Sequence, residues 1–234
     1  MLTNILSKCA VLAAALVLSG CSTGGRGFFP RSNTVEAAHL VGPVAWHASN
    51  ERQCLSSGLV RETPYIQSAP SIGRASGCGA VRPFVVRAAM RGQVAFRPSA
   101  TLRCPMITPL ERWLQGTVQP AAARYLGRRV TELKVIASYS CRSRNGRRGA
   151  KLSEHGRANA IDISAFELDD GRRVTVKRGW RSASAEADFL RAIHRGACRH
   201  FSTVLGPNAD RHHHDHFHFD LARHGRTGRH SVCR

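Results

Sequence analysis

The chain has 234 residues, and its 35 Lys+Arg residues against 15 Asp+Glu residues give a formal charge of +20. This length is typical of one domain with a short appendage, and the 42% hydrophobic content excludes a chain that is disordered throughout. The only long apolar run lies at the N-terminus, which excludes a polytopic membrane protein. The positive charge indicates an anionic partner, with nucleic acid as the first class to consider. The eight cysteines indicate an oxidising compartment.

Residues 1–20 have the pattern of an export signal. Lys8 precedes an apolar core from Ala10 to Leu18, which is too short to span a bilayer comfortably but suits a secretory signal. The core runs into Leu18-Ser19-Gly20-Cys21, which resembles the bacterial lipobox. The resemblance implies that Cys21 becomes the lipidated first residue of the mature protein. A plain signal peptide with an incidental cysteine is the alternative.

A lipidated cysteine predicts a location in the cell envelope. Several acyl chains on Cys21 would anchor the protein firmly to a membrane, facing the periplasm of a Gram-negative-type bacterium. Ser22 stands where an aspartate would favour inner-membrane retention, so the outer membrane is expected. Residues 21–50 are rich in Gly, Ser, Asn and Ala and predict a flexible tether, which leaves residues 51–234 for the folded domain.

Six cysteines remain when the signal and the lipidated residue are set aside. An even number in an exported domain predicts three disulfides, although the sequence does not select their connectivity. A bridge between Cys104 and Cys141 is one hypothesis, since it would hold the neighbouring Arg142 in place. A thiolate metal site is disfavoured, because no CxxC or CxH spacing occurs. The six candidates are Cys54, Cys78, Cys104, Cys141, Cys198 and Cys233.

Helical and extended patterns follow one another without a βαβ rhythm. A helix is predicted over 105–127, broken or restarted at Pro120 and capped by Gly127, and an amphipathic helix over 184–201. The turn Asp169-Asp170-Gly171 predicts a hairpin. We therefore expect an α+β fold, with a small antiparallel sheet, flanking helices and disulfide staples. Strands are predicted over 130–139, 160–167, 173–177 and 217–221.

Three segments contain residues suited to a metal site and its surroundings. They are SEHGRANAID at 153–162, DHFH at 215–218, and SYSCR at 138–142. Imidazole nitrogen and carboxylate oxygen are typical zinc ligands. His216 and His218 alternate along a predicted strand, so both imidazoles would face the same side. Three protein ligands leave a fourth coordination position for water, which is the arrangement of a catalytic zinc site.

These segments resemble the zinc peptidase superfamily that includes lysostaphin-type enzymes, D-Ala-D-Ala metallopeptidases and the hedgehog signalling domain. The D-Ala-D-Ala branch carries SxHxxGxAxD and a downstream (E/D)xxHxH-like element. More closely, the chain resembles the bacterial extensin-like C-terminal domain family over roughly residues 53–233, without the Pro-rich repeats of plant extensins. The matching segments are SYSCRSRN, LSEHGRANAIDI, FLRAIHRGAC and FSTVLGPNADRHHHDHFHFD.

The resemblance implies a hedgehog/DD-peptidase-like fold and a zinc ion held by His155, Asp162 and His218. It also assigns four catalytic positions. These are Asp215 as the base, His216 as the histidine that supports the transition state, Arg142 as the arginine that grips substrate, and Ser153 as the serine before the first ligand.

Some residues depart from the superfamily pattern. Ala158 replaces a glycine, so the turn there is expected to avoid a conformation that only glycine tolerates. Phe217 replaces the more common Trp, and the base is Asp215 rather than a glutamate. His213 stands where some murein endopeptidases of the superfamily carry another histidine. The histidine-rich run 212–216 also leaves open a metal-sequestering tract.

This combination favours a zinc-dependent peptidase that acts on peptidoglycan cross-links or stem peptides, with Asp215 taking the proton from a zinc-activated water. A catalytically silent wall-binding or partner-binding module is the alternative, because fold alone does not fix function. Nucleic acid is not expected as a partner. The arginines are dispersed, aromatic residues make up only 6%, and no RNP, helix-turn-helix or zinc-finger pattern occurs.

Overall fold

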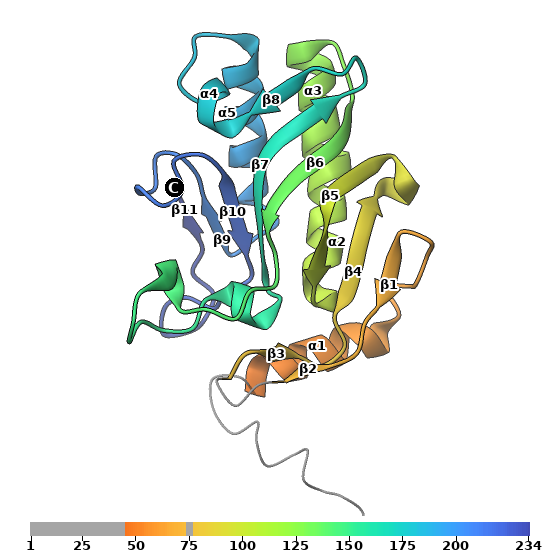
Figure 1. Cartoon of the computed structure of the whole chain (residues 1–234), viewed down its shortest axis with the longest axis vertical. Coiled ribbons are helices and arrows are strands. Elements are labelled where there is room, and N and C mark those ends of the chain that lie inside the picture. The colour runs from red at the N-terminus through yellow and green to blue at the C-terminus, as the bar shows by residue number, and fades with distance from the viewer. Residues whose placement is uncertain (1–44, 74–76) are drawn as a thin grey trace, which may run out of the picture. The chain divides into compact units, whose positions relative to one another are not determined.

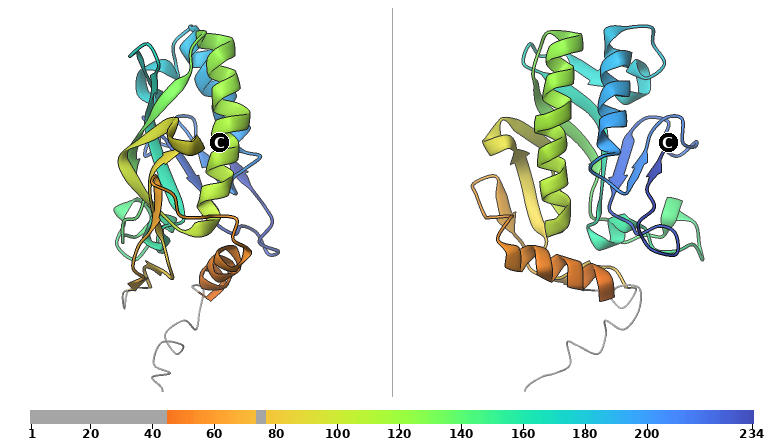
Figure 2. Two further views of the ribbon diagram at one scale, coloured as in Figure 1. Left: turned by 90° about the vertical axis from the view of Figure 1, so that its right-hand side faces the viewer. Right: turned by 180° about the vertical axis from the view of Figure 1, so that it is seen from behind.

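The computed structural model describes residues 45–73 and 77–234. Cys21, the expected signal and most of the expected tether lie outside the described residues. One large mixed sheet organises the described part of the chain, and helices cover one of its faces (Figures 1 and 2). The strand order along this sheet is β1 (Ile66–Ser68), β4 (Phe84–Ala89), β5 (Val94–Leu102), β6 (Val130–Ala137), β7 (Ala160–Leu168), β10 (Phe217–Asp220), β9 (Thr203–Leu205) and β11 (Val232–Cys233).

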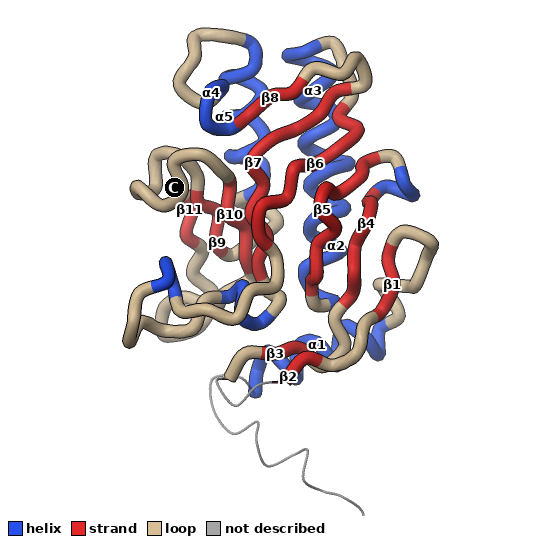
Figure 3. Tube along the Cα trace, in the orientation of Figure 1, coloured by secondary structure: helices blue, strands red, loops and turns tan. Residues whose placement is uncertain are grey.

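The expected α+β class is confirmed, but the sheet is larger and more mixed than the small antiparallel sheet predicted from the sequence. The strands β5 and β6 are parallel, as are β9 and β11. A parallel pair requires a long crossover connection, and the helix after β5 supplies it. The described part of the chain therefore contains a β–helix–β unit, contrary to the expectation of none. Two short strands, β2 (Ile72–Gly73) and β3 (Gly79–Ala80), form a separate ribbon (Figure 3).

The crossover helix runs without interruption through α2 (Cys104–Trp113), the π-helical turn η4 (Leu114–Val118) and α3 (Gln119–Leu126). Pro120 was expected to break or restart this helix. The helix is not broken, but regular α-helix restarts at α3, with Pro120 in its first turn. The wider π-helical turn lies directly before Pro120 and accommodates the missing N–H and the ring. Gly127 ends the helix in the left-handed conformation, with φ 63°, as predicted. Trp113 is fully buried, and its indole N–H donates to the carbonyl of Ile193 at 2.9 Å.

Most other predicted elements are present with small differences at their ends. The amphipathic helix α5 (Ala185–Ala197) ends before the predicted limit of 201, and β10 matches the predicted strand at 217–221. The hairpin between β7 and β8 (Arg173–Thr175) is confirmed, with Gly171 at φ 82°. The second hairpin strand is shorter than predicted, because α4 (Val176–Gly179) begins directly after it.

Helix α1 (Ala45–Ser57) was not predicted, and it shortens the expected tether. Its residues 45–50 were assigned to the tether, yet His47 is buried. The Glu51 carboxylate, also buried, accepts the backbone N–H groups of Val81 and Arg82 at 2.9 and 3.0 Å. These contacts hold α1 against the segment around β3, so the folded unit begins before residue 51.

Three disulfides are present among the described residues, as expected, and their connectivity is now assigned. Cys54 of α1 pairs with Cys104 of α2, and Cys78 pairs with Cys141. The hypothesis of a Cys104–Cys141 bridge is therefore wrong, because Cys104 faces α1 at a Cα–Cα distance of 5.9 Å. The loop that begins at Cys141 is tied instead to the segment beside β3. The third pair joins the residue after α5 to β11, as Cys198–Cys233.

Candidate metal centre

Three buried side chains from separate elements meet at one point: His155, Asp162 and His218. His155 lies in the 3-10 turn η6 (Glu154–Arg157), directly before β7. Asp162 on β7 and His218 on β10 are direct cross-strand partners in the antiparallel register. Side chains of directly paired residues project from the same face of a sheet, so the pairing brings a carboxylate and an imidazole together.

The turn that presents His155 is closed by a residue in a strained conformation. Ala158 has φ 50° and ψ 27°, so the expectation that it avoids the left-handed region is wrong. This conformation costs an alanine about 1–2 kcal/mol. Hydrogen bonds offset that cost, since the carbonyl of Ala158 accepts the N–H of Arg103 at 2.8 Å and its own N–H donates to the carbonyl of His155 at 3.1 Å.

The two imidazole nitrogens and the two carboxylate oxygens of Asp162 lie close enough together to form a small metal site. His155 Nε2 lies 3.2 Å from His218 Nδ1 and 3.1 Å from Asp162 Oδ2, and His218 Nδ1 lies 2.7 Å from Asp162 Oδ1. A tetrahedral ion with bonds of about 2.1 Å holds its ligand atoms roughly 3.4 Å apart. The three distances in the cluster are shorter than this, and the shortest, at 2.7 Å, must lengthen by about 0.7 Å for the cluster to hold zinc. Its two nitrogens and one carboxylate fit the donor preference of that ion.

The outer nitrogen of each imidazole is held by an acceptor. His155 Nδ1 donates to the carbonyl of Ser138 at 2.6 Å, which leaves its Nε2 lone pair directed at the cluster. His218 Nε2 lies 2.9 Å from the carboxylate of Asp220, and that carboxylate also accepts the N–H of Ala222 at 2.8 Å. Such partners fix the orientation of metal-binding histidines and raise their basicity.

The electrostatics of the cluster favour a positive charge at its centre. Burial alone would lower the pKa of His218, but hydrogen bonds to Asp162 and Asp220 outweigh burial and raise this pKa to about 10. Burial would likewise raise the pKa of Asp162, but the hydrogen bonds to His155 and His218 hold it far below its ordinary value. The two carboxylates thus stabilise a positive charge on the imidazoles, and their negative charge would stabilise a divalent metal ion in the same way.

A pocket of about 510 Å³ opens onto the cluster. The three predicted ligands line it, and so do Arg142, Ser153 and His216 from the predicted catalytic set. The Ser153 hydroxyl accepts the backbone N–H of His155 at 3.4 Å and so caps η6. Asp215 is not among the lining residues. Its carboxylate instead lies 2.9 Å from His216 Nδ1, so its contact with the pocket passes through that imidazole.

Comparison with known proteins adds one finding. The family described as extensin-like protein C-terminus matches residues 52–234. The chain belongs to this family. Searches of curated proteins and of solved structures each returned no match. The extensin-like segment includes all three residues of the metal cluster and every described residue that lines its pocket.

A further Asp–His pair lies in the same pocket of the extensin-like domain. Asp210 Oδ1 lies 2.8 Å from His213 Nδ1, and the His213 ring lies 5.6 Å from that of His218. The sequence had singled out His213 by position but had not predicted its partner. Asp220 was also missed, although it stands two residues after His218 on one strand and therefore faces the same side.

A buried polar network fixes the loop that precedes the first ligand. The Glu154 carboxylate binds His47 Nε2 at 2.9 Å, the Asn159 amide at 2.6 Å and the Arg157 guanidinium at 3.2 Å. Burial would raise the pKa of Glu154, but these partners lower it to about 2. Because His47 belongs to α1, this unpredicted helix, which begins before the extensin-like segment, helps to position His155.

Proposed function

We propose that this protein is a zinc-dependent peptidase of the cell envelope that acts on peptidoglycan peptides, with a fold of the hedgehog/D-Ala-D-Ala metallopeptidase superfamily. The observation that carries the proposal is the buried cluster of His155, Asp162 and His218, open to a pocket that also contains Arg142 and His216. Two imidazoles and one carboxylate leave a coordination position for water and substrate, as catalytic zinc sites do.

When bound, zinc would supply Lewis acidity, making water a nucleophile near neutral pH and polarising the amide carbonyl. Within the pocket, Arg142 binds a carboxylate or carbonyl oxygen of the peptide through its planar guanidinium. His216 Nε2 lies 3.8 Å from Asp162 Oδ2, which places its ring beside the reacting centre. There it can donate to the oxygen that develops negative charge in the transition state.

Two groups compete for the role of proton acceptor. Asp215 is the acceptor that the sequence predicts, and its contact with His216 offers a route into the pocket. His213 lines the pocket itself, and burial lowers its pKa despite the opposing hydrogen bond to Asp210. A lowered pKa keeps an imidazole neutral and able to accept a proton near pH 7. We propose that the base is one of these two residues.

The proposed location rests on Cys21, which would carry the lipid that tethers the domain to a membrane facing the periplasm, in the outer membrane. Among the described residues, no helix has both the length and the apolarity to cross a bilayer. A basic domain on such a tether is attracted to the anionic cell wall. Peptidoglycan stem peptides are then the substrate class within reach.

The test is digestion of purified muropeptides by the zinc-loaded protein, read by mass spectrometry, with a chelated sample in parallel. Cleavage that requires zinc, with a defined mass loss, supports the proposal and names the scissile bond. Stoichiometric zinc without any cleavage would favour a catalytically silent wall-binding module. The absence of bound zinc would overturn both readings.

A further inference from the structure

A strongly basic loop begins directly after Cys141, which forms a disulfide with Cys78. The stretch 142–151 carries five cationic side chains and no acidic one. In the described part of the chain, none of the five forms an ion pair with an acidic side chain. Four of them are exposed, and Arg142 is half-buried. The five are Arg142, Arg144, Arg147, Arg148 and Lys151.

The arginines near the β7–β8 hairpin, by contrast, are matched with acids. At the β7–β8 hairpin, the Asp170 carboxylate lies 3.0 Å from Arg128 and 2.8 Å from Arg172, and Arg173 pairs with Glu167. The loop at 142–151 therefore concentrates repulsive charge that the protein does not neutralise. Like charges held close together raise the free energy of a fold. Such an arrangement is expected where an external anion supplies the missing charge.

The loop has a defined backbone conformation. The Arg144 N–H donates to the carbonyl of Lys151 at 2.9 Å, and the Ser143 hydroxyl donates to the carbonyl of Arg147 at 2.6 Å. Asn145 takes the left-handed conformation, φ 55°, at the tip of this hairpin. The hydrogen bonds close a hairpin, so the cations are presented from an ordered turn.

This hairpin forms part of the wall of the metal pocket. Arg142, Arg144, Asn145 and Gly146 line the same 510 Å³ pocket as the metal cluster. Arg142 follows closely after Ser138, whose carbonyl accepts the ring N–H of His155. The exposed Arg144 extends the positive surface from the pocket wall toward solvent.

We propose that the basic hairpin 142–151 binds a second carboxylate of the peptide substrate, in addition to the group held beside the metal. The inference rests on the proposed peptidase function for the nature of the ligand. A guanidinium matches a carboxylate in a two-point hydrogen bond, which explains the predominance of arginine over lysine. The pocket therefore prefers acidic peptides to peptides whose carboxylates are blocked as amides.

The experiment compares binding of two probes to the zinc-loaded protein by calorimetry at low salt. The first is a peptidoglycan stem peptide with free carboxylates, and the second is the same peptide with its side-chain carboxylates amidated. The wild type is expected to bind the first roughly 3- to 10-fold more tightly, and added salt should reduce the ratio. The triple variant Arg144→Gln/Arg147→Gln/Arg148→Gln should lose the preference and keep its zinc.

The matched control is Arg195→Gln, which removes an exposed charge from α5 without touching the pocket. It should retain the preference. Equal affinity of the wild type for both probes, binding of neither probe, or a preference that survives the triple substitution would overturn the inference. Cleavage is recorded in parallel. A charge preference without cleavage would leave the role of the hairpin intact and count against the proposed peptidase activity alone.

Discussion

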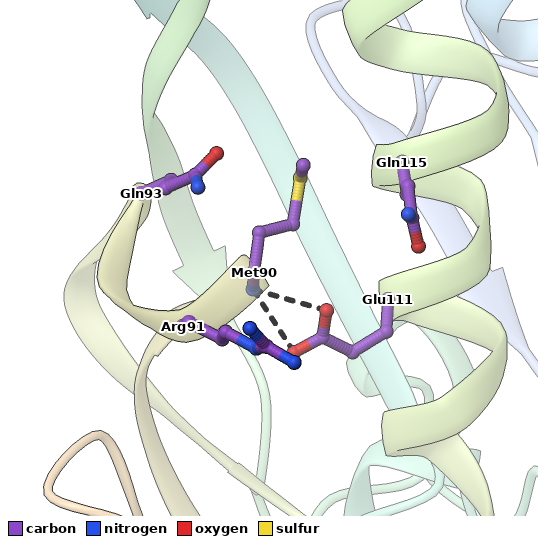
Figure 4. Close-up of a pocket in the computed structure, with 5 residues that line it drawn as sticks. All are labelled: Met90, Arg91, Gln93, Glu111 and Gln115. Carbon is purple, nitrogen blue, oxygen red and sulfur yellow. Dashed lines mark hydrogen bonds between the residues drawn. The ribbon is translucent and has the colours of Figure 1, made fainter.

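Two hollows of similar size lie in the described part of the molecule, and their chemistry differs. The metal pocket has a volume of about 510 Å³, and the other hollow, of about 430 Å³, lies between the β4–β5 turn and the crossover helix. Figure 4 shows the second hollow, with Met90, Arg91 and Gln93 from the turn facing Glu111 and Gln115 from the helix. In size the two hollows are close, so volume does not identify the functional one.

The two hollows differ in the contacts of their carboxylates, Glu111 in the second hollow and Asp162 in the metal pocket. Both Glu111 carboxylate oxygens accept the backbone N–H of Met90 at 3.0 Å, and Met90 and Arg91 are left-handed, with φ 53° and 58° (Figure 4). Glu111 is therefore engaged in holding a strained turn. In the metal pocket, by contrast, Asp162 faces two imidazoles at 3.1 and 2.7 Å. The arrangement of donors, rather than the cavity, indicates a binding function.

The largest effect is expected from removing a ligand. His155→Ala and His218→Ala should each reduce bound zinc from about one ion per chain to near none, and abolish muropeptide cleavage, because two protein ligands hold zinc poorly. Metal analysis after dialysis measures the first effect. His214→Ala is the control, since His214 is exposed and outside the pocket lining. Unchanged zinc in both ligand variants would remove the site.

The next effect separates the two candidate bases. Loss of a general base typically lowers kcat by about 10²- to 10⁴-fold. Asp215→Asn should produce that loss with zinc retained if Asp215 is the acceptor, whereas His213→Gln should produce it if His213 is. Steady-state kinetics with zinc content measured on each sample decides between them. Full activity in both variants would exclude both residues as the base.

A third prediction concerns His194, which is buried like His218 but, in the part of the chain that the structure describes, has no hydrogen bond to a carboxylate side chain. His194 packs between Trp180 and Phe217, with ring centroids 5.2 and 5.1 Å away. Burial, with the charge of Arg195, lowers its pKa to about 4, despite a hydrogen bond with the Arg234 backbone. Between pH 6.5 and about pH 4, His194 is protonated in the unfolded chain but neutral in the folded chain. Stability is therefore complete above pH 6.5 and falls as the pH drops toward 4.

The expected loss across this window is on the order of 3 kcal/mol in the free energy of unfolding. Urea unfolding at a series of pH values measures it. His194→Gln removes the titrating group, so its stability should depend less on pH across this window than that of the wild type. Equal pH dependence in the two proteins would contradict the assignment.

The smallest effect is expected in the second hollow. Glu111→Ala should lower the free energy of unfolding by about 1–2 kcal/mol, because the Met90 N–H loses a charged acceptor. Zinc content and cleavage should not change. Denaturant unfolding with metal analysis checks both points. A loss of zinc in this variant would show that the two hollows are coupled and would contradict the structural role of Glu111.

The three residues of the candidate metal cluster could be singled out from the sequence, because they lie in short segments that resemble the zinc peptidase superfamily. His155 and Asp162 stand seven residues apart across one turn, and His218 lies on a strand whose alternation is visible. The helix from α2 to α3 and the hairpin at Gly171 also follow from local signals. The π-helical turn before Pro120 was not predicted, because such turns have no recognised local pattern.

What the sequence missed depends on contacts between distant segments. Helix α1 has little amphipathic character, and it is fixed by the Cys54–Cys104 disulfide and by His47 on Glu154, 107 positions away. Disulfide partners share no local signal, so the Cys104–Cys141 hypothesis could not be checked without the fold. The Asp210–His213 pair was equally hidden, because only the loop conformation brings its atoms to 2.8 Å.

Zinc K-edge X-ray absorption on the zinc-loaded protein tests the central claim most directly. The structure predicts two imidazole nitrogens, from His155 and His218, together with oxygen donors from Asp162 and solvent, and no sulfur. A shell of three or four imidazoles would place the ion in the histidine-rich run 212–216 instead. That result, or a shell containing sulfur, would contradict the assignment of the buried cluster as the metal centre.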